Sequence, residues 1–170
     1  IWKTLIYLEK DIYESKNVDS VKMQKLLKSL ARNESTVVSN NKLIKDISDN
    51  DDLNIDKRTV SDYIEILEKL NLFSNQLSYS TNYRSPERVG KNVKRHFTDP
   101  SLAAALLNMN ANKLIADLKT FGFLFEALVE RDLKIYMDYL DGNLYHFRDN
   151  VTGLEVDSIL EFPDGEYAAV

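Results

Sequence analysis

Apolar residues recur at helical spacing through the first half of the chain. One run follows the i, i+3, i+4, i+7 pattern of an amphipathic helix: Met23, Leu26, Leu27 and Leu30. Asp19 and Ser20 precede this run and belong to the residue types that cap helix N-termini. The same periodicity predicts helices over residues 2–14, 20–32, 41–48 and 56–70. Segments 72–73 and 76–83 then predict a short β-ribbon.

Helices followed by a β-ribbon are the pattern of a winged helix-turn-helix domain, which we expect over residues 1–83. The helix over residues 56–70 would face DNA. Its first turn offers side chains that reach phosphates and base edges: Lys57, Arg58, Thr59 and Ser61. The same helix carries Asp56, Asp62, Glu65 and Glu68, which oppose DNA. Direct DNA contact and contact with a partner protein therefore both remain open.

Residues 84–100 form a connector with a basic cluster, which comprises Arg88, Lys91, Lys94 and Arg95. The cluster is either a solvated linker or a grip for phosphate. Gly90-Lys91 resembles the end of a phosphate-binding loop, but that motif needs Gly at position 85 and Ser or Thr at position 92. The chain has Ser85 and Asn92 there, so we expect no nucleotide site in these 170 residues.

The second half of the chain predicts a long helix over residues 111–139, with a possible break near Gly122. Its apolar stripe comprises Leu114, Leu118, Phe121, Phe125, Leu128 and Tyr136. We expect Phe125 and Leu128 to be buried against a sheet, to which residues 144–149 contribute a strand. A helix packed on strands makes this half an α/β domain, expected over residues 85–170.

The last stretch predicts a β-hairpin. Residues 154–162 alternate between apolar and polar, and Pro163-Asp164-Gly165 is a turn that leads into residues 166–170. A three-residue loop pairs Phe162 with Glu166, Leu160 with Ala168, and Ser158 with Val170. In that register Asp157 faces the position after Val170. Because the chain also begins with Ile1 rather than Met, we expect it to be an internal fragment of a longer protein.

Composition narrows the classes of function. The net charge is −5, and it lies in residues 85–170, since residues 1–84 carry 13 basic and 13 acidic residues. Neither half is the strongly basic body of an autonomous nucleic-acid binder. The absence of Cys excludes disulfides, thiolate metal sites and Cys nucleophiles, and the two His argue against a His-based zinc site. No apolar run is long enough to cross a membrane, and we expect a cytoplasmic protein.

Two carboxylates carry the candidate chemistry. Glu126 borders an apolar helix face, and Asp157 lies on a strand whose other face we expect in the core through Leu154, Val156, Leu160 and Phe162. A helix carboxylate and a strand carboxylate can form a cup for Mg²⁺, which prefers oxygen ligands. Two structural alternatives remain open. Glu126 can pair with Arg131 or Arg148, and Asp157 can be part of a polar strand face with Glu155 and Glu161.

Several motifs together resemble a family of bacterial and archaeal AAA-type ATPases. They are Lys94-Arg-His-Phe-Thr-Asp99, Gly122-Phe-Leu-Phe-Glu126, Tyr145-His-Phe-Arg-Asp149, Glu155-Val-Asp157 and Glu166-Tyr-Ala-Ala-Val170. Members of this family have an N-terminal ATPase, a winged helix, and a C-terminal domain of unknown function. That last domain is similar to the PD-(D/E)xK restriction-endonuclease fold.

The resemblance implies an α+β protein in which a winged helix precedes a nuclease-like domain that ends before its Glu-x-Lys strand. It implies that Glu126 and Asp157 are both catalytic and metal-binding, with Mg²⁺ in the intact protein and no metal in this fragment. ATP would bind to the missing ATPase domain. We therefore expect a DNA-associated, nuclease-like portion of an ATPase that is inactive as this fragment. The alternative is a non-catalytic interaction or regulatory module.

Overall fold

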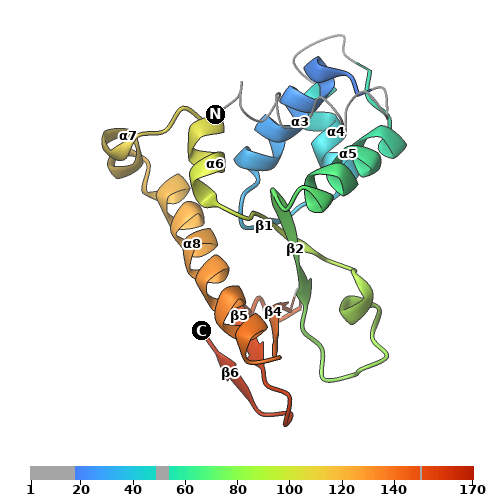
Figure 1. Cartoon of the computed structure of the whole chain (residues 1–170), viewed down its shortest axis with the longest axis vertical. Coiled ribbons are helices and arrows are strands. Elements are labelled where there is room, and N and C mark those ends of the chain that lie inside the picture. Colours follow the sequence, from blue (N-terminus) through green and yellow to red (C-terminus); the bar gives the residue numbers. More distant parts are fainter. Residues whose placement is uncertain (1–17, 49–53, 150) are drawn as a thin grey trace.

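The computed structural model describes residues 18–48, 54–149 and 151–170, and this part of the chain folds as a mixed α+β protein (Figure 1). Its six α-helices are α3 (Ser20–Arg32), α4 (Asn40–Ser48), α5 (Lys57–Lys69), α6 (Pro100–Leu106), α7 (Ala111–Ala116) and α8 (Leu118–Tyr139). Its six strands are β1 (Thr36–Val37), β2 (Phe73–Ser78), β3 (Lys94–Phe97), β4 (Asn143–Arg148), β5 (Glu155–Glu161) and β6 (Tyr167–Ala169). The helix predicted over residues 2–14 lies outside the described residues.

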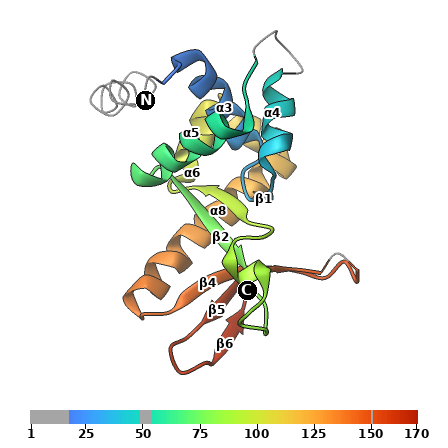
Figure 2. The same ribbon diagram turned by 90° about the vertical axis from the view of Figure 1, so that its right-hand side faces the viewer.

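All six strands form one sheet in the order β1-β3-β2-β4-β5-β6. The β2–β4 pair is parallel and the other pairs are antiparallel. In Figures 1 and 2, β2 runs from the helices α3 to α6 at one end of the molecule toward β4, β5 and β6 at the other. The sheet therefore continues across both halves that the sequence predicts as domains.

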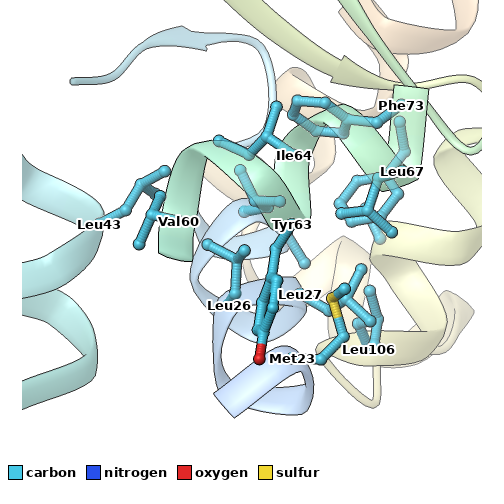
Figure 3. Packing of buried hydrophobic residues seen from close by; sticks show 14 of the residues in the cluster. Met23, Leu26, Leu27, Leu43, Val60, Tyr63, Ile64, Leu67, Phe73 and Leu106 are labelled. Atoms are coloured by element: carbon cyan, nitrogen blue, oxygen red, sulfur yellow. The ribbon is translucent and has the colours of Figure 1, made fainter. Parts of the chain in front are cut away.

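The helices predicted over 20–32, 41–48 and 56–70 are confirmed as α3, α4 and α5. Asp19 caps α3 by accepting hydrogen bonds from the backbone N–H groups of Val21 and Lys22, and Asp56 caps α5 through Thr59. The apolar faces of these helices meet around Leu26, Val60 and Leu67, which are fully buried (Figure 3). We call the end of the molecule that contains α3 to α6 the helical end. Burial of these apolar faces supplies most of its stability.

The β-ribbon predicted at 72–83 is wrong in its second strand. One strand, β2, extends over Phe73–Ser78, and its antiparallel partner is β3 of the predicted connector. A long segment separates the two strands, with a short 3₁₀ helix at Pro86–Val89 (η1). Alternation alone cannot show that a strand pairs with residues about 20 positions away.

The contacts of Arg88 fix the connector over residues 84–100 in place. The prediction of a solvated linker is therefore wrong at Arg88. Its guanidinium donates to both oxygens of Glu161, at 2.8 and 3.1 Å. The same guanidinium lies 4.6–5.1 Å from the ring centres of Tyr79, Tyr83 and Tyr145. A bidentate ion pair among aromatic rings ties η1 to β5.

The long helix predicted over 111–139 is interrupted at Asp117 rather than near Gly122. Asp117 has φ −123° and ψ 78°, so it leaves the helical conformation and ends α7. Its carboxylate then caps α8 by accepting from the N–H of Thr120 at 3.1 Å and from its hydroxyl at 2.7 Å. Gly122 lies inside α8.

The predicted burial of Phe125 and Leu128 is also wrong. Phe125 is 56% exposed and Leu128 is 37% exposed, whereas Leu124 and Ala127 are buried. The same stripe leaves Leu118, Phe121 and Tyr136 exposed. The helix therefore buries a neighbouring face, on which the small Ala127 permits close approach.

The C-terminal hairpin has the predicted register. Leu160 pairs with Ala168, the N–H of Phe162 donates to the carbonyl of Glu166, and Ser158 and Val170 exchange backbone hydrogen bonds. The predicted inner face of β5 is wrong at Leu154, which is 63% exposed and precedes the strand. The buried residues of β5 are the consecutive Ser158, Ile159 and Leu160, so both faces of the strand are covered there.

Two adjacent residues of α8 provide a test of its buried face. Leu124→Ala should lower the free energy of unfolding by about 2–5 kcal/mol because it leaves a cavity. Phe125→Ala should cost about 1 kcal/mol or less because much of the ring is already in water. Urea denaturation of both variants measures the difference. A larger loss for Phe125→Ala would show that α8 is rotated from the orientation described.

Candidate functional site

The ammonium group of Lys94 lies between the two predicted acidic residues. Its Nζ donates to Oδ1 of Asp157 at 2.8 Å and forms an ion pair with Oε1 of Glu126. The Lys94 side chain is only 3% exposed, whereas that of Glu126 is 21% exposed and that of Asp157 is 54% exposed. The sequence-predicted carboxylates thus converge on one cation, which is supplied by the chain itself.

Three elements position these groups. Lys94 begins β3, where it faces Gln76 of β2 across the antiparallel pair. The Gln76 side chain donates to the backbone carbonyl of Asp157 at 3.0 Å, which links β2 to β5. Glu126 reaches the same point from α8. The cluster therefore joins β3 and α8 to the second half of the sheet.

A buried polar chain extends from Gln76 beneath the cluster. Oε1 of Gln76 lies 3.2 Å from Nε2 of His96, and Nδ1 of His96 lies 3.3 Å from the hydroxyl of Ser35. That hydroxyl donates to the backbone carbonyl of Phe123 on α8 at 2.8 Å. Burial lowers the pKa of His96 to about 3, so the ring is neutral at physiological pH. A neutral ring has one N–H, and the facing oxygens of Gln76 and Ser35 both act as acceptors here, so His96 donates only one of these two hydrogen bonds.

Burial and pairing act in opposite directions on the charges of the cluster. Burial lowers the pKa of Lys94, but its bonds to Asp157 and Glu126 outweigh burial, and the pKa lies above its ordinary value. Burial raises the pKa of Glu126, and the bond to Lys94 opposes this only in part. Lys94 therefore keeps its proton, and its positive charge faces the two acidic side chains.

Glu130 lies on α8 one helical turn after Glu126. It is 4% exposed. Burial raises its pKa to about 7, partly opposed by Lys134 and Lys94. Its carboxyl group is therefore partly protonated near neutral pH.

A cavity of about 590 Å³ opens beside the cluster, between α8 and the C-terminal hairpin. Glu126, Asp157, Ser158 and Lys119 supply its polar walls, and its remaining walls are apolar: Leu118, Gly122, Phe123, Phe125, Val129 and Val170. The two carboxylates are therefore accessible from a cleft, while the ammonium of Lys94 lies behind them.

The alternative partners predicted for Glu126 are wrong. Arg131 binds Asp132 at 2.8 Å, and Arg148 lies 3.8 Å from Glu155. Sequence reasoning did not assign Lys94 to the site. The available signal was its spacing from His96, because positions i and i+2 share one strand face, and both residues are buried in β3.

The donor groups fit a hard cation. Both carboxylates already share a cation, and Mg²⁺ commonly binds one or two protein carboxylates together with water and phosphate oxygens. Among the described residues, no group of three or more His, Asp or Glu is placed to hold a metal ion. Any metal at this site would therefore have only Glu126 and Asp157 as acidic protein ligands within the described part of the chain.

The predicted DNA-contacting residues lie elsewhere. Lys57, Arg58 and Ser61 are exposed on the first turn of α5, and Thr59 is half-buried there. Arg58 lies 4.0 Å from Asp62, and the hydroxyl of Ser61 accepts from Asn40. Figure 1 shows α5 at the opposite end of the molecule from β5 and β6. The two predicted sites are therefore separate.

A family model described as Domain of unknown function (DUF8612) matches residues 4–113, which is more than half of the chain. The matched range contains Lys94 and the proposed DNA-contacting residues but ends before Glu126. Neither a curated protein nor a solved structure matches the chain. Within the described ranges, no helix combines the length and apolar character needed to span a membrane.

The raised pKa of Glu130 gives a testable pH dependence. Between pH 4.5 and about 7 the unfolded chain releases this proton while the folded protein retains it. Stability must therefore fall as pH rises through this window. Relative to wild type, Glu130→Gln should gain about 2–3 kcal/mol in unfolding free energy between pH 4.5 and pH 8, measured by urea denaturation.

The exposed Glu166 offers a matched control, since Glu166→Gln removes a carboxyl group from the hairpin and should leave the pH dependence unchanged. A stability difference between wild type and Glu130→Gln that stays constant with pH would show that the buried carboxyl does not titrate as described.

Proposed function

We propose that this chain, which belongs to the family described as Domain of unknown function (DUF8612), is a DNA-associated, nuclease-like module. The observation that carries the proposal is the convergence of Glu126 and Asp157 on the ammonium of Lys94 beside an open cleft. A helix acid, a strand acid and a lysine are the groups expected from a resemblance to the PD-(D/E)xK fold. Here the lysine comes from β3 rather than from a Glu-x-Lys segment.

Each group has a distinct proposed role at a phosphodiester. Glu126 and Asp157 would hold Mg²⁺, and Lys94 would stabilise negative charge on the phosphate. Bound Mg²⁺ supplies Lewis-acid chemistry at phosphate oxygens. Glu130 holds a proton near neutral pH beside the cluster, within the same helix face as Glu126.

We propose that residues 1–170 by themselves are inactive. The ammonium of Lys94 already pairs with both carboxylates, so a divalent cation has to displace it. The cost of leaving a buried ammonium unpaired opposes this exchange.

The helical end supports the winged-helix part of the proposal. Its elements follow the order α3, β1, α4, α5, β2, β3, and β3 pairs with both β1 and β2. The exposed first turn of α5 offers Lys57, Arg58, Thr59 and Ser61 to DNA. The resemblance to AAA-type ATPases further predicts an ATPase domain as a neighbour, and ATP would bind there.

A second candidate function is a non-catalytic interaction or regulatory module. The burial of Lys94 favours it, because a side chain 3% exposed acts well as a structural tie between β3 and α8. In this case the cluster serves only stability, and the helical end contacts a partner protein.

A Mn²⁺ titration monitored by calorimetry separates these functions. Wild type should bind weakly or not at all, whereas Lys94→Met should bind Mn²⁺ because both carboxylates are released from their internal cation. Adding Asp157→Asn to Lys94→Met should abolish that binding. Adding Glu166→Gln instead should preserve it, since Glu166 is exposed and does not line the cavity. Circular dichroism confirms that each variant remains folded.

Mn²⁺ binding that is insensitive to Asp157→Asn would contradict the proposed site. A folded Lys94→Met variant that binds no Mn²⁺ would favour the interaction module instead.

A further inference from the structure

The positive charge of the helical end is concentrated on α3 and α4. Residues 20–48, which contain α3, β1 and α4, carry six basic and two acidic residues in a chain whose net charge is −5. Both acids are turned inward: Glu34 is 3% exposed, and the side chain of Asp46 is 5% exposed. The outer surface of this segment is therefore basic.

Three of the basic residues lie on one side of α3. At 100° per residue, Lys25, Lys28 and Arg32 fall within about 60° of each other around the helix axis. Together with Asp46 and Ile47 of α4 they line a groove of about 280 Å³. We call this surface the basic groove and include Lys42 of α4, whose ammonium binds Asp46.

The buried carboxylate of Asp46 binds side chains on both helices of the basic groove. Its carboxylate accepts hydrogen bonds from Asn33 at 2.9 Å and from Lys42 at 2.5 Å, and lies 3.6 Å from Arg32. Burial raises the pKa of Asp46, but the bonds from Lys42 and Asn33 outweigh burial and lower it overall. One buried acid thus holds basic side chains from two helices around the groove, and their positive charge exceeds its own.

The first turn of α5 is less favourable for a polyanion. Asp56 and Asp62 flank Lys57 and Arg58, and the guanidinium of Arg58 lies 4.0 Å from Asp62. A separate groove lies beside α5, where Lys22 of α3 and Arg58 of α5 line it together with the acids Asp19 and Asp62. The acids of this groove make it, like the first turn of α5, a poorer surface for phosphate than the basic groove.

We propose that the basic groove is the principal contact for the phosphate backbone of DNA, an inference that rests on the proposed DNA association. Lys and Arg recognise phosphates without reading sequence. The binding is therefore sequence-independent and falls steeply with salt, by about 0.9 logarithmic units of affinity per logarithmic unit of salt for each phosphate neutralised. The first turn of α5 makes the smaller contribution.

Two variants with identical charge loss test this assignment. Lys28→Gln/Arg32→Gln removes one Lys and one Arg from the basic groove, and Lys57→Gln/Arg58→Gln removes the same pair from α5. Fluorescence anisotropy of a 20-base-pair duplex from 20 to 200 mM KCl measures affinity and salt dependence. The groove variant should bind at least tenfold more weakly with a salt slope reduced by about 2, and the α5 variant at most threefold more weakly.

A charge-preserving variant, Lys28→Arg/Arg32→Lys, should retain wild-type affinity within about threefold and so separates charge loss from misfolding. Greater loss in the α5 variant than in the groove variant would overturn the inference while leaving DNA association intact. Absence of DNA binding at 20 mM KCl would overturn both. Binding of polyglutamate in place of DNA, weakened by the groove variant, would assign the groove to an acidic protein and also overturn the inference.

Discussion

The burial of the Lys94 ammonium is the constraint on which the junction of the molecule depends. An unpaired cation at 3% side-chain exposure would be strongly unfavourable, so Glu126 and Asp157 have to meet it. Glu126 comes from α8 and Asp157 from β5, and the two segments are thereby fixed relative to β3. The buried bonds of Gln76, His96 and Ser35 follow the same path and support it without additional charge.

This constraint also explains the division between burial and exposure on α8. The helix turns Glu126, Ala127 and Glu130 toward the sheet and the buried polar groups, where acids find a cation or a proton. Leu124 and Met137 of the same helix are also buried, whereas other large apolar side chains, such as Phe125, are exposed at the cleft or to solvent. The orientation of this helix therefore serves both its acids and the apolar residues Leu124, Ala127 and Met137.

Local features of the sequence predicted much of the fold. The periodicity of α3, α4 and α5 and the turn before β6 depend on neighbouring residues, and these elements were predicted closely. The partner of β2 and the role of Lys94 depend on contacts between distant segments, which periodicity does not encode. The convergence of Glu126 and Asp157 was predicted from their positions on a helix and a strand and from the family resemblance, whereas the cation between them was not predicted. The face of α8 was misjudged because large apolar residues were taken as the buried ones.

The parallel pair of β2 and β4 has a consequence for the order of folding. Leu77 pairs with Tyr145 across a long sequence separation, whereas β2 and β3 pair across a much shorter one. Closing the longer loop costs more entropy, so the helical end with β1, β2 and β3 can assemble first. In that early structure Lys94 has not yet paired with Glu126 and Asp157. The ion pairs of Lys94 with Glu126 and Asp157 form only when α8 and β5 pack against β3. Their formation would therefore be a late step of folding.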